Sequence, residues 1–341
     1  MESIYSYTLD DISDSLLNIG YKKFHSDILF DWLYIKRIKS FNQITNLKKE
    51  LIEKLNENYV ISTMQIIKIE REEDTYKYLF RLYDNEYIEA VYMKHNYGNS
   101  LCISTQIGCN ISCAFCESGR LKKLRDLTPN EMIEQILLVE EDLGFRITHL
   151  VLMGIGEPFD NYDNVIKFID IINHPKGLAL GSRHITISTS GIIPKINEFA
   201  GISKQVNLAI SLHASNDSVR DKLIPINKVY PISELIKSVK NYIKKTNRRV
   251  TFEYIMLDGI NDKETHALEL SKLLKGINCY VNLIPYNETS YTDFKKSNKD
   301  NILKFYDILK KNKINVTIRK EFGSNLSAAC GQLRSDYKEG K

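Results

Sequence analysis

Hydrophobic positions recur first at helical spacing and then in alternation. Residues 22–38 and 46–59 place apolar side chains every three or four positions, which predicts amphipathic helices. Between residues 62 and 95, three apolar or alternating runs are separated by the polar tripeptides DTY and DNE, which are typical of turns. We therefore expect residues 1–60 to form a small helical module and residues 61–98 to form a β-ribbon.

Beyond residue 98, apolar runs alternate with helical stretches. Six runs predict strands: LCIST (101–105), THLVLMG (148–154), HITISTS (184–190), VNLAISLH (206–213), RVTFEYIML (249–257) and CYVNLIPY (279–286). Thr128-Pro129-Asn130-Glu131 is a capping box with proline at the first helical position, so a helix should begin there. This alternation predicts an α/β domain of parallel βαβ units over residues 99–334, with a short tail at 335–341. A doubly wound sheet and a barrel of six βα units both fit the pattern.

Polar or glycine-rich segments follow five of the six predicted strands. They are the cysteine loop after the first, GIGEP (154–158), STSG (188–191), SLH (211–213) and PYN (285–287). The carboxyl ends of parallel strands meet at one edge of a sheet or one mouth of a barrel, and functional groups gather there. We therefore expect these segments to form one site.

The first of these segments, CISTQIGCNISCAFC (102–116), holds four of the six cysteines. Cys109, Cys113 and Cys116 have the spacing C-x3-C-x2-C. Structural zinc sites usually have four ligands, and no second cysteine pair or closely spaced histidine pair is present in the sequence. Three thiolates better fit a [4Fe–4S] cluster that leaves one iron open to a small molecule. Zinc and inert buried cysteines are the alternatives.

Composition and charge narrow the class of protein. No apolar run reaches the roughly 18 residues of a membrane span, and the polar start of the chain does not resemble a secretory signal. Six cysteines in 341 residues do not indicate a disulfide scaffold, so we expect a reduced, cytoplasmic protein. Residues 1–95 carry 13 Lys and Arg against 16 Asp and Glu, whereas the remainder carries 34 against 27. That basic excess suits a phosphate-rich partner.

The cysteine spacing, Phe115 before the third cysteine, and GIGEP resemble the radical S-adenosylmethionine (SAM) superfamily. Seven segments in order resemble, more narrowly, the RlmN/Cfr family of radical SAM RNA methyltransferases: LCISTQIGCNISCAFC, VLMGIGEPFDNYDNV, RHITISTSGIIPKI, AISLHASNDSVRDKLIPIN, NRRVTFEYIMLDGIND, VNLIPYN and AACGQLR. The similarity covers residues 85–334, and residues 22–47 resemble the family's small leading module more loosely. It implies a partial (β/α)6 TIM-like radical SAM barrel behind an RNA-binding module.

The resemblance also implies a reaction. The enzymes on the RlmN side methylate C2 of an adenosine in 23S ribosomal RNA, and some also modify a transfer RNA adenosine next to the anticodon. GIGEPFDNYDNV and STSG are more similar to that side, so C2 is expected. Implied cofactors are one [4Fe–4S] cluster and two SAM molecules per turnover, with flavodoxin or ferredoxin as electron donor to a monomeric enzyme. The alternatives are Cfr-type methylation of C8, another radical SAM reaction, and a non-enzymatic iron–sulfur or zinc RNA-binding protein.

The family's functional residues can be assigned by their matching positions. Cys330 would carry the methyl group taken from one SAM, and a radical made from the second SAM would activate that group for addition to adenine. Cys102 would then attack the sulfur of Cys330 and release the crosslinked product, leaving a disulfide, while Glu89 would act as acid/base. The implied cluster ligands are Cys109, Cys113 and Cys116, and the implied SAM contacts are Gly156, Glu157, Ser188, Ser211, Leu212, His213 and Asn287. Cys279 is expected to pack in the core.

The sequence departs from the family pattern in two places. After the third cysteine, Glu117-Ser118 replaces a small residue and Thr or Ser, and Asp126 stands in the following loop where Asn is common. Before AACGQLR, Asn325-Leu326-Ser327 replaces an acidic pair. All five cysteines of the implied mechanism are present. The departures therefore bear on the substrate and the rate rather than on the type of chemistry.

Overall fold

The computed structural model describes residues 1–319 except 203 and 290–291. Its N-terminal part is helical and consists of β1 (Glu2–Ser3), the 3-10 turn η1 (Ile4–Ser6), α1 (Leu9–Asn18), α2 (Phe24–Tyr34), η2 (Phe41–Gln43), α3 (Lys49–Asn58) and β2 (Tyr59–Val60). Thr8 caps α1, because its hydroxyl accepts from the Asp11 amide while the Asp11 carboxylate accepts from the Thr8 amide. β1 pairs in parallel with β2, which brings the two ends of this part together.

A ten-stranded sheet organises the rest of the described chain. Its strands are β3 (Gln65–Glu72), β4 (Thr75–Arg81), β5 (Tyr87–His95), β6 (Gly98–Cys102), β9 (His149–Leu152), β10 (Ile185–Thr189), β11 (Asn207–Ser211), β12 (Val250–Met256), β13 (Cys279–Pro285) and β14 (Val316–Ile318). The first four pair antiparallel, and β6 to β14 pair in parallel. The ribbon and the six parallel strands predicted from the sequence are therefore confirmed, and β14 is an addition.

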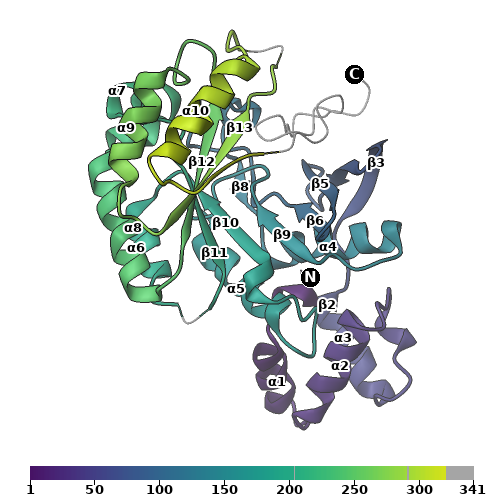
Figure 1. The fold of residues 1–341 in the computed structure, drawn as a ribbon. Helices are drawn as coiled ribbons and strands as arrows, with labels where there is room; N and C mark the ends of the chain where they lie inside the picture. Colours follow the sequence, from purple (N-terminus) through teal and green to yellow (C-terminus); the bar gives the residue numbers. More distant parts are fainter. Residues whose placement is uncertain (203, 290–291, 320–341) are drawn as a thin grey trace.

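The parallel strands lie in chain order, β6-β9-β10-β11-β12-β13-β14. A doubly wound sheet would reverse direction at a switch point, so that alternative is excluded. Right-handed crossovers that always advance in one direction leave their helices on one side of the sheet. These helices are α4 (Pro129–Leu143), α5 (Tyr162–Asn173), α6 (Ile193–Phe199), α7 (Asp217–Leu223), α8 (Ile232–Thr246), α9 (Glu264–Leu274) and α10 (Lys299–Lys311) (Figure 1). β3 and β14 are the two edges, so the barrel is partial, as expected.

The ribbon continues the barrel wall, and like the barrel it has a buried outer face and a separate inner face. Tyr78, Phe80, Ile88 and Ala90 are fully buried on the outer face, where Tyr78 donates to Asp142 of α4. The residues between them in sequence form the inner face, which continues the inner face of the barrel. This alternation follows from the two-residue period of a strand.

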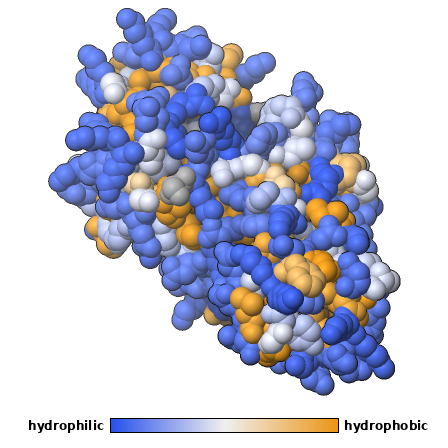
Figure 2. Space-filling model, turned by 90° about the horizontal axis from the view of Figure 1, so that it is seen from below, coloured by the Kyte–Doolittle hydropathy of each residue, from blue (hydrophilic) through white to orange (hydrophobic). Residues whose placement is uncertain are grey.

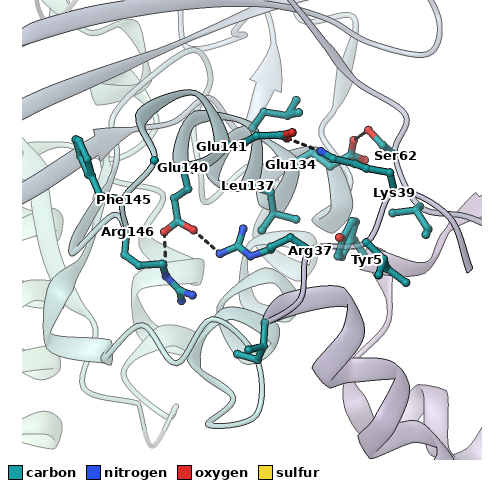
Figure 3. A pocket seen from close by; sticks show the side chains of 15 residues that line it. Tyr5, Arg37, Lys39, Ser62, Glu134, Leu137, Glu140, Glu141, Phe145 and Arg146 are labelled. Carbon is teal, nitrogen blue, oxygen red and sulfur yellow. Dashed lines mark hydrogen bonds and ion pairs between the residues drawn. The ribbon is translucent and has the colours of Figure 1, made fainter. Parts of the chain in front are cut away.

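A buried carboxylate of α4 holds the segment that follows the N-terminal helices and β2. Glu134 accepts from the Ser62 hydroxyl at 2.6 Å and from the amides of Thr63 and Met64 at 2.9 and 3.1 Å. Around it lies a cavity of about 400 Å³, across which Arg37 pairs with Glu140 and Lys39 with Glu141 (Figure 3). The helical module and the barrel therefore share a polar seam.

Figure 2 shows one face of the surface, where hydrophobic residues occur in small groups among hydrophilic ones. Large exposed hydrophobic side chains such as Tyr83, Tyr97 and Val229 come from separate parts of the chain. None of the helices in the described part of the chain has both the length and the apolar character needed to cross a bilayer.

Replacement of Glu134 by alanine should lower the free energy of unfolding by about 2–4 kcal/mol, because it leaves several buried donors without an acceptor. Chemical denaturation followed by circular dichroism measures this. Glu141→Ala is the matched control on the same helix: its carboxylate is half exposed, so the loss should stay below about 1 kcal/mol. Equal losses in the two variants would contradict this account of the seam.

Candidate active site

A cavity of about 140 Å³ opens at the carboxyl ends of the parallel strands. The cysteine loop forms one wall, and the rest is formed by β9 to β13 with the loops that follow them and by Arg319 after β14. Eight of the residues predicted from the sequence line it: Cys109, Cys113, Cys116, Gly156, Glu157, Ser188, Ser211 and His213. Segments that are far apart in the sequence therefore meet at one place, as expected for the carboxyl ends of parallel strands.

The other predicted residues lie outside the cavity lining. Leu212 is fully buried in the main core, and Asn287 is half-buried beyond the end of β13. Cys102 packs beside the cavity with Val91, Ile155 and Met153, and Met153 itself lines it. Glu89 lies on the same face of β5 as Val91. Cys330 lies outside the described residues.

Backbone contacts within the cysteine loop and to α7 fold this loop tightly. The Cys109 amide donates to Leu121, the Ala114 amide donates to Leu223, and a Cβ at Gly119 would lie 2.9 Å from the backbone of Cys113. Glycine is therefore required at position 119, where the returning chain passes over the loop. The backbone fixes the three thiols within one wall of the cavity.

The donor set fits an iron–sulfur cluster. Burial raises the pKa of Cys109 to about 12 and raises that of Cys113 well above its usual value, and each thiolate disfavours its neighbours. Burial also raises the pKa of Cys116, although the amides of Gly119 and Ser118 partly offset this. Three thiolates are thus stable here only with a strongly cationic group, which an iron–sulfur cluster provides. In the described part of the chain, no three His, Cys, Asp or Glu residues form a group that could hold a single metal ion.

Gly156 and Glu157 are placed by close contact with the segment after β6. Gly156 has φ +110°, and a Cβ there would lie 2.6 Å from the Cβ of Gln106. The buried Glu157 carboxylate accepts from the amides of Ser190 at 2.7 Å and Phe159 at 2.9 Å. Burial raises the pKa of Glu157, and these hydrogen bonds lower it in part. The glutamate is therefore held rigidly at the cavity.

Gln106 connects this loop to the short hairpin of β7 (Gln106–Ile107) and β8 (Arg125–Asp126). Its carbonyl accepts from the Glu157 amide at 2.8 Å, and its amide group donates to Asp126 and Asp160 at 2.8 and 3.0 Å. Lys123 pairs with both aspartates at 2.8 Å. The departure at Asp126 is thus accompanied by a local cation that compensates its charge.

His213 takes a left-handed conformation, with φ +55°, at the end of the SLH segment. Its amide donates to the carbonyl of Glu253, and Nδ1 accepts from the Ile255 amide at 3.0 Å. Burial lowers the pKa of His213 to about 3, so the ring is neutral with its proton on Nε2. Phe115 meets this ring edge-on at 4.9 Å. The Ser188 and Ser211 hydroxyls lie 3.3 Å apart on neighbouring strands.

Two family models match the chain: the radical SAM superfamily over residues 103–270 and the ribosomal RNA large subunit methyltransferase N-terminal domain over residues 3–61. The "probable dual-specificity RNA methyltransferase RlmN" of Acholeplasma laidlawii is 51% identical over 97% of this chain and 98% of its own. The protein of the same name from Enterococcus faecalis is 52% identical over 98% of this chain and 96% of its own. The chain belongs to the RlmN family.

A solved structure extends the RlmN assignment to three dimensions. The crystal structure of a radical SAM methyltransferase from Sphaerobacter thermophilus is 37% identical, covers 98% of this chain and 99% of its own, and has a TM-score of 0.94. The radical SAM barrel expected for an RlmN protein is therefore confirmed. Membership in the radical SAM superfamily also implies a [4Fe–4S] cluster and SAM as its cofactors.

Sequence reasoning missed a buried arginine of this RlmN site. Arg220 of α7 is fully buried and donates to the carbonyls of Ser190, Ser211 and Leu212 at 2.6, 3.0 and 3.1 Å. Burial lowers its pKa to about 10, which still leaves it charged at neutral pH. An arginine in SVRDKL gives no sequence signal that separates it from a solvated helix residue.

Two charged residues of the cavity lining were also missed. Glu253 of β12 is buried, and one of its oxygens accepts from Asn282 at 3.2 Å. Its other oxygen has no hydrogen-bond partner in the described part of the chain. Burial raises the pKa of Glu253, and Arg319, which also lines the cavity, lowers it in part. A lone charge within the apolar run VTFEYIM was the signal that could have identified Glu253.

Replacement of Gly156 by alanine should weaken SAM binding at least about tenfold. The added Cβ would collide with Gln106, and alanine does not readily adopt the positive φ of this position, so the loop would move. Equilibrium dialysis of the reconstituted protein with labelled SAM measures this. Gly259→Ala is the control: its φ is +68° but nothing lies within 4 Å of the added Cβ. Matching SAM affinities in the two variants would contradict the steric argument.

Replacement of Arg220 by lysine should lower the free energy of unfolding by about 2–3 kcal/mol, because an ammonium group cannot reach three carbonyls in the same geometry. Urea denaturation measures the loss. Lys222→Met on the exposed side of the same helix should change it by less than about 0.5 kcal/mol. A wild-type value for Arg220→Lys would show that its hydrogen bonds to the three carbonyls do not stabilise the fold.

Proposed function

We propose that this RlmN protein methylates C2 of an adenosine in 23S ribosomal RNA and of a transfer RNA adenosine next to the anticodon, with Cys330 as methyl carrier. The observation that carries the proposal is the single cavity lined by the three-cysteine loop and GIGEP, with Cys102 packed at its side. The names of the relatives, dual-specificity RNA methyltransferase RlmN, support an RNA substrate of two kinds.

The residues of the cavity have distinct binding roles in this proposal. Cys109, Cys113 and Cys116 would hold the cluster, which supplies the electron for reductive cleavage of SAM. Gly156 and Glu157 would bind the amino end of SAM. The serine pair and the neutral His213 ring would contact the remainder, and Leu212 and Asn287 would border it. Two SAM molecules are used per turnover, one as methyl donor and one as radical source.

Cys102 suits its proposed role as the thiol that releases the product. It is 6% exposed at the end of β6 and lies against the cavity wall, so water has little access to it. In the release step, the Cys102 thiolate attacks the sulfur of Cys330, the new S–S bond forms, and the carbon–sulfur bond to the methylated base breaks. The electron pair stays on the carbon, which takes up a proton. Glu89 removes the proton from the adenine ring.

Each part of the chain has its own role in this proposal. Residues 1–60 and the basic excess of the C-terminal part grip the RNA backbone, residues 61–98 extend the barrel wall, residues 99–334 form the catalytic domain, and residues 335–341 form the tail. Single-stranded or locally unfolded RNA is the preferred substrate, because an unpaired base costs least to extrude. A flavodoxin- or ferredoxin-type donor supplies electrons to this cytoplasmic monomer.

The test compares Cys102→Ala with Cys330→Ala. Each variant is reconstituted with iron and sulfide and incubated with SAM, reductant and a 23S rRNA fragment. We expect Cys102→Ala to accumulate a covalent RNA–protein adduct on a denaturing gel, because nothing cleaves the crosslink. Cys330→Ala should yield neither adduct nor methylated RNA, because the carrier is missing.

Cys279→Ala is the matched control, since Cys279 is a buried cysteine on β13 with no proposed role. Mass spectrometry of the wild-type product should show methylation at C2. A product methylated only at C8 would favour the Cfr-type reaction. Absence of any adduct in Cys102→Ala, with SAM still cleaved, would indicate a different radical SAM reaction.

A further inference from the structure

Four side chains of alternating charge form a row on the inner face of the ribbon. Lys68 and Glu70 of β3 are 2.7 Å apart, Glu70 and Lys77 of β4 are 3.1 Å apart, and Lys77 lies 3.3 Å from Glu89 of β5. Together with Leu79 they line a small cavity of about 120 Å³. We call these four residues the charge row.

The charge row runs from solvent into the protein. The exposed fraction of its side chains falls from 57% at Lys68 to 29% at Glu70, 14% at Lys77 and 9% at Glu89. A lysine as buried as Lys77 is retained only when it is paired, because the unpaired ammonium loses its hydration. Lys77 has two such partners, one on each side.

The two partners compete for Lys77. Burial alone would raise the pKa of Glu70, but hydrogen bonds from Lys68 and then Lys77 outweigh burial and hold that pKa below its usual value. Glu70 is therefore ionised and pairs with both lysines. Lys77 is shared between two carboxylates, those of Glu70 and Glu89.

The strand register places Lys77 and Glu89 near the active site. Lys77 lies directly opposite Val91, and Val91 lies directly opposite Cys102, so the three share the inner face. Glu89 is two residues before Val91 on that face, and the Ser104 hydroxyl donates to its carbonyl at 2.6 Å. In the described part of the chain, the other ionisable groups that the register places on this face are Glu72 of β3, Arg81 of β4, Tyr87 and His95 of β5, and Cys102 of β6.

We propose that Lys77 is a positioning residue that holds Glu89 as an ionised base, and that Glu70 limits this effect so that Glu89 can still accept a proton. The inference rests on the proposed function, in which Glu89 takes a proton from the adenine ring. A buried carboxylate without a cation would stay protonated and could not act as a base, whereas one with an unshared cation would hold a proton poorly. Because Lys77 is shared between Glu70 and Glu89, Glu89 can be ionised and can still accept a proton.

The test titrates Glu89 directly in the full-length chain, with ¹³C-labelled glutamate side chains and the Glu89 signal identified by its loss in Glu89→Gln. Lys77→Met should move the titration of Glu89 to higher pH by about one unit or more, because a cation 3.3 Å from its carboxylate is removed. Glu70→Gln should move it to lower pH, because Lys77 then serves Glu89 alone. A merely structural disturbance would shift both variants in one direction.

Two further variants complete the design. Lys77→Arg keeps the cation and should stay close to the wild-type titration, and Lys94→Met, at an exposed lysine near the end of β5, should match it. Shifts of the same sign in Lys77→Met and Glu70→Gln, or no shift in Lys77→Met, would overturn the inference. If Lys77→Met does not fold, the direction of the Glu70→Gln shift decides.

The pH profile of methylation separates this inference from the proposed function. A base must be ionised to accept a proton, so the rising limb of the profile should move to higher pH in Lys77→Met and to lower pH in Glu70→Gln. The Glu89 titration could shift in opposite directions in the two variants while the pH profile of methylation stays unchanged. That result would support the role of Lys77 and would show that Glu89 does not carry the proton in the reaction.

Discussion

The geometry of the active site depends on the buried guanidinium of Arg220. It binds carbonyls at the ends of two neighbouring strands, those of Ser190 and Ser211, and so fixes the spacing of β10 and β11. The Ser190 amide in turn donates to Glu157, and the Glu157 amide donates to Gln106. One chain of hydrogen bonds therefore runs across the cavity from α7 to the β7–β8 hairpin. Loss of the arginine would loosen several walls at once.

The same residue contributes to the charge balance of the site. Three cysteines, Glu157 and Glu253 bring acidic groups to the cavity. In the described part of the chain, the fields of Arg220 and Arg319 reach Cys113 and Glu253 and act against these acidic groups. A positively charged cluster core and the sulfonium of SAM would complete the balance, so the site is better suited to its cofactors than to remaining empty.

Local sequence features predicted much of this molecule. The C-x3-C-x2-C spacing and the capping box at Thr128 are short-range signals, and both lie where the sequence placed them. The choice between a doubly wound sheet and a barrel depended on the direction of the crossovers, which the apolar pattern does not encode. β14 has only three residues, too few for a periodic signal. Arg220 and Gln106 act through contacts with distant segments, so no local pattern could mark them.

The two departures near the site have different consequences. Asp126 is matched by Lys123 within the same hairpin, so its charge is compensated where it arises. Glu117 is 4% exposed beside Cys116, with one oxygen 3.4 Å from Arg120 and the other without a partner in the described residues. A buried carboxyl group beside Cys116, a proposed cluster ligand, has little solvent to screen it. Glu117, rather than Asp126, is therefore the position that we expect to alter the surroundings of the cofactor.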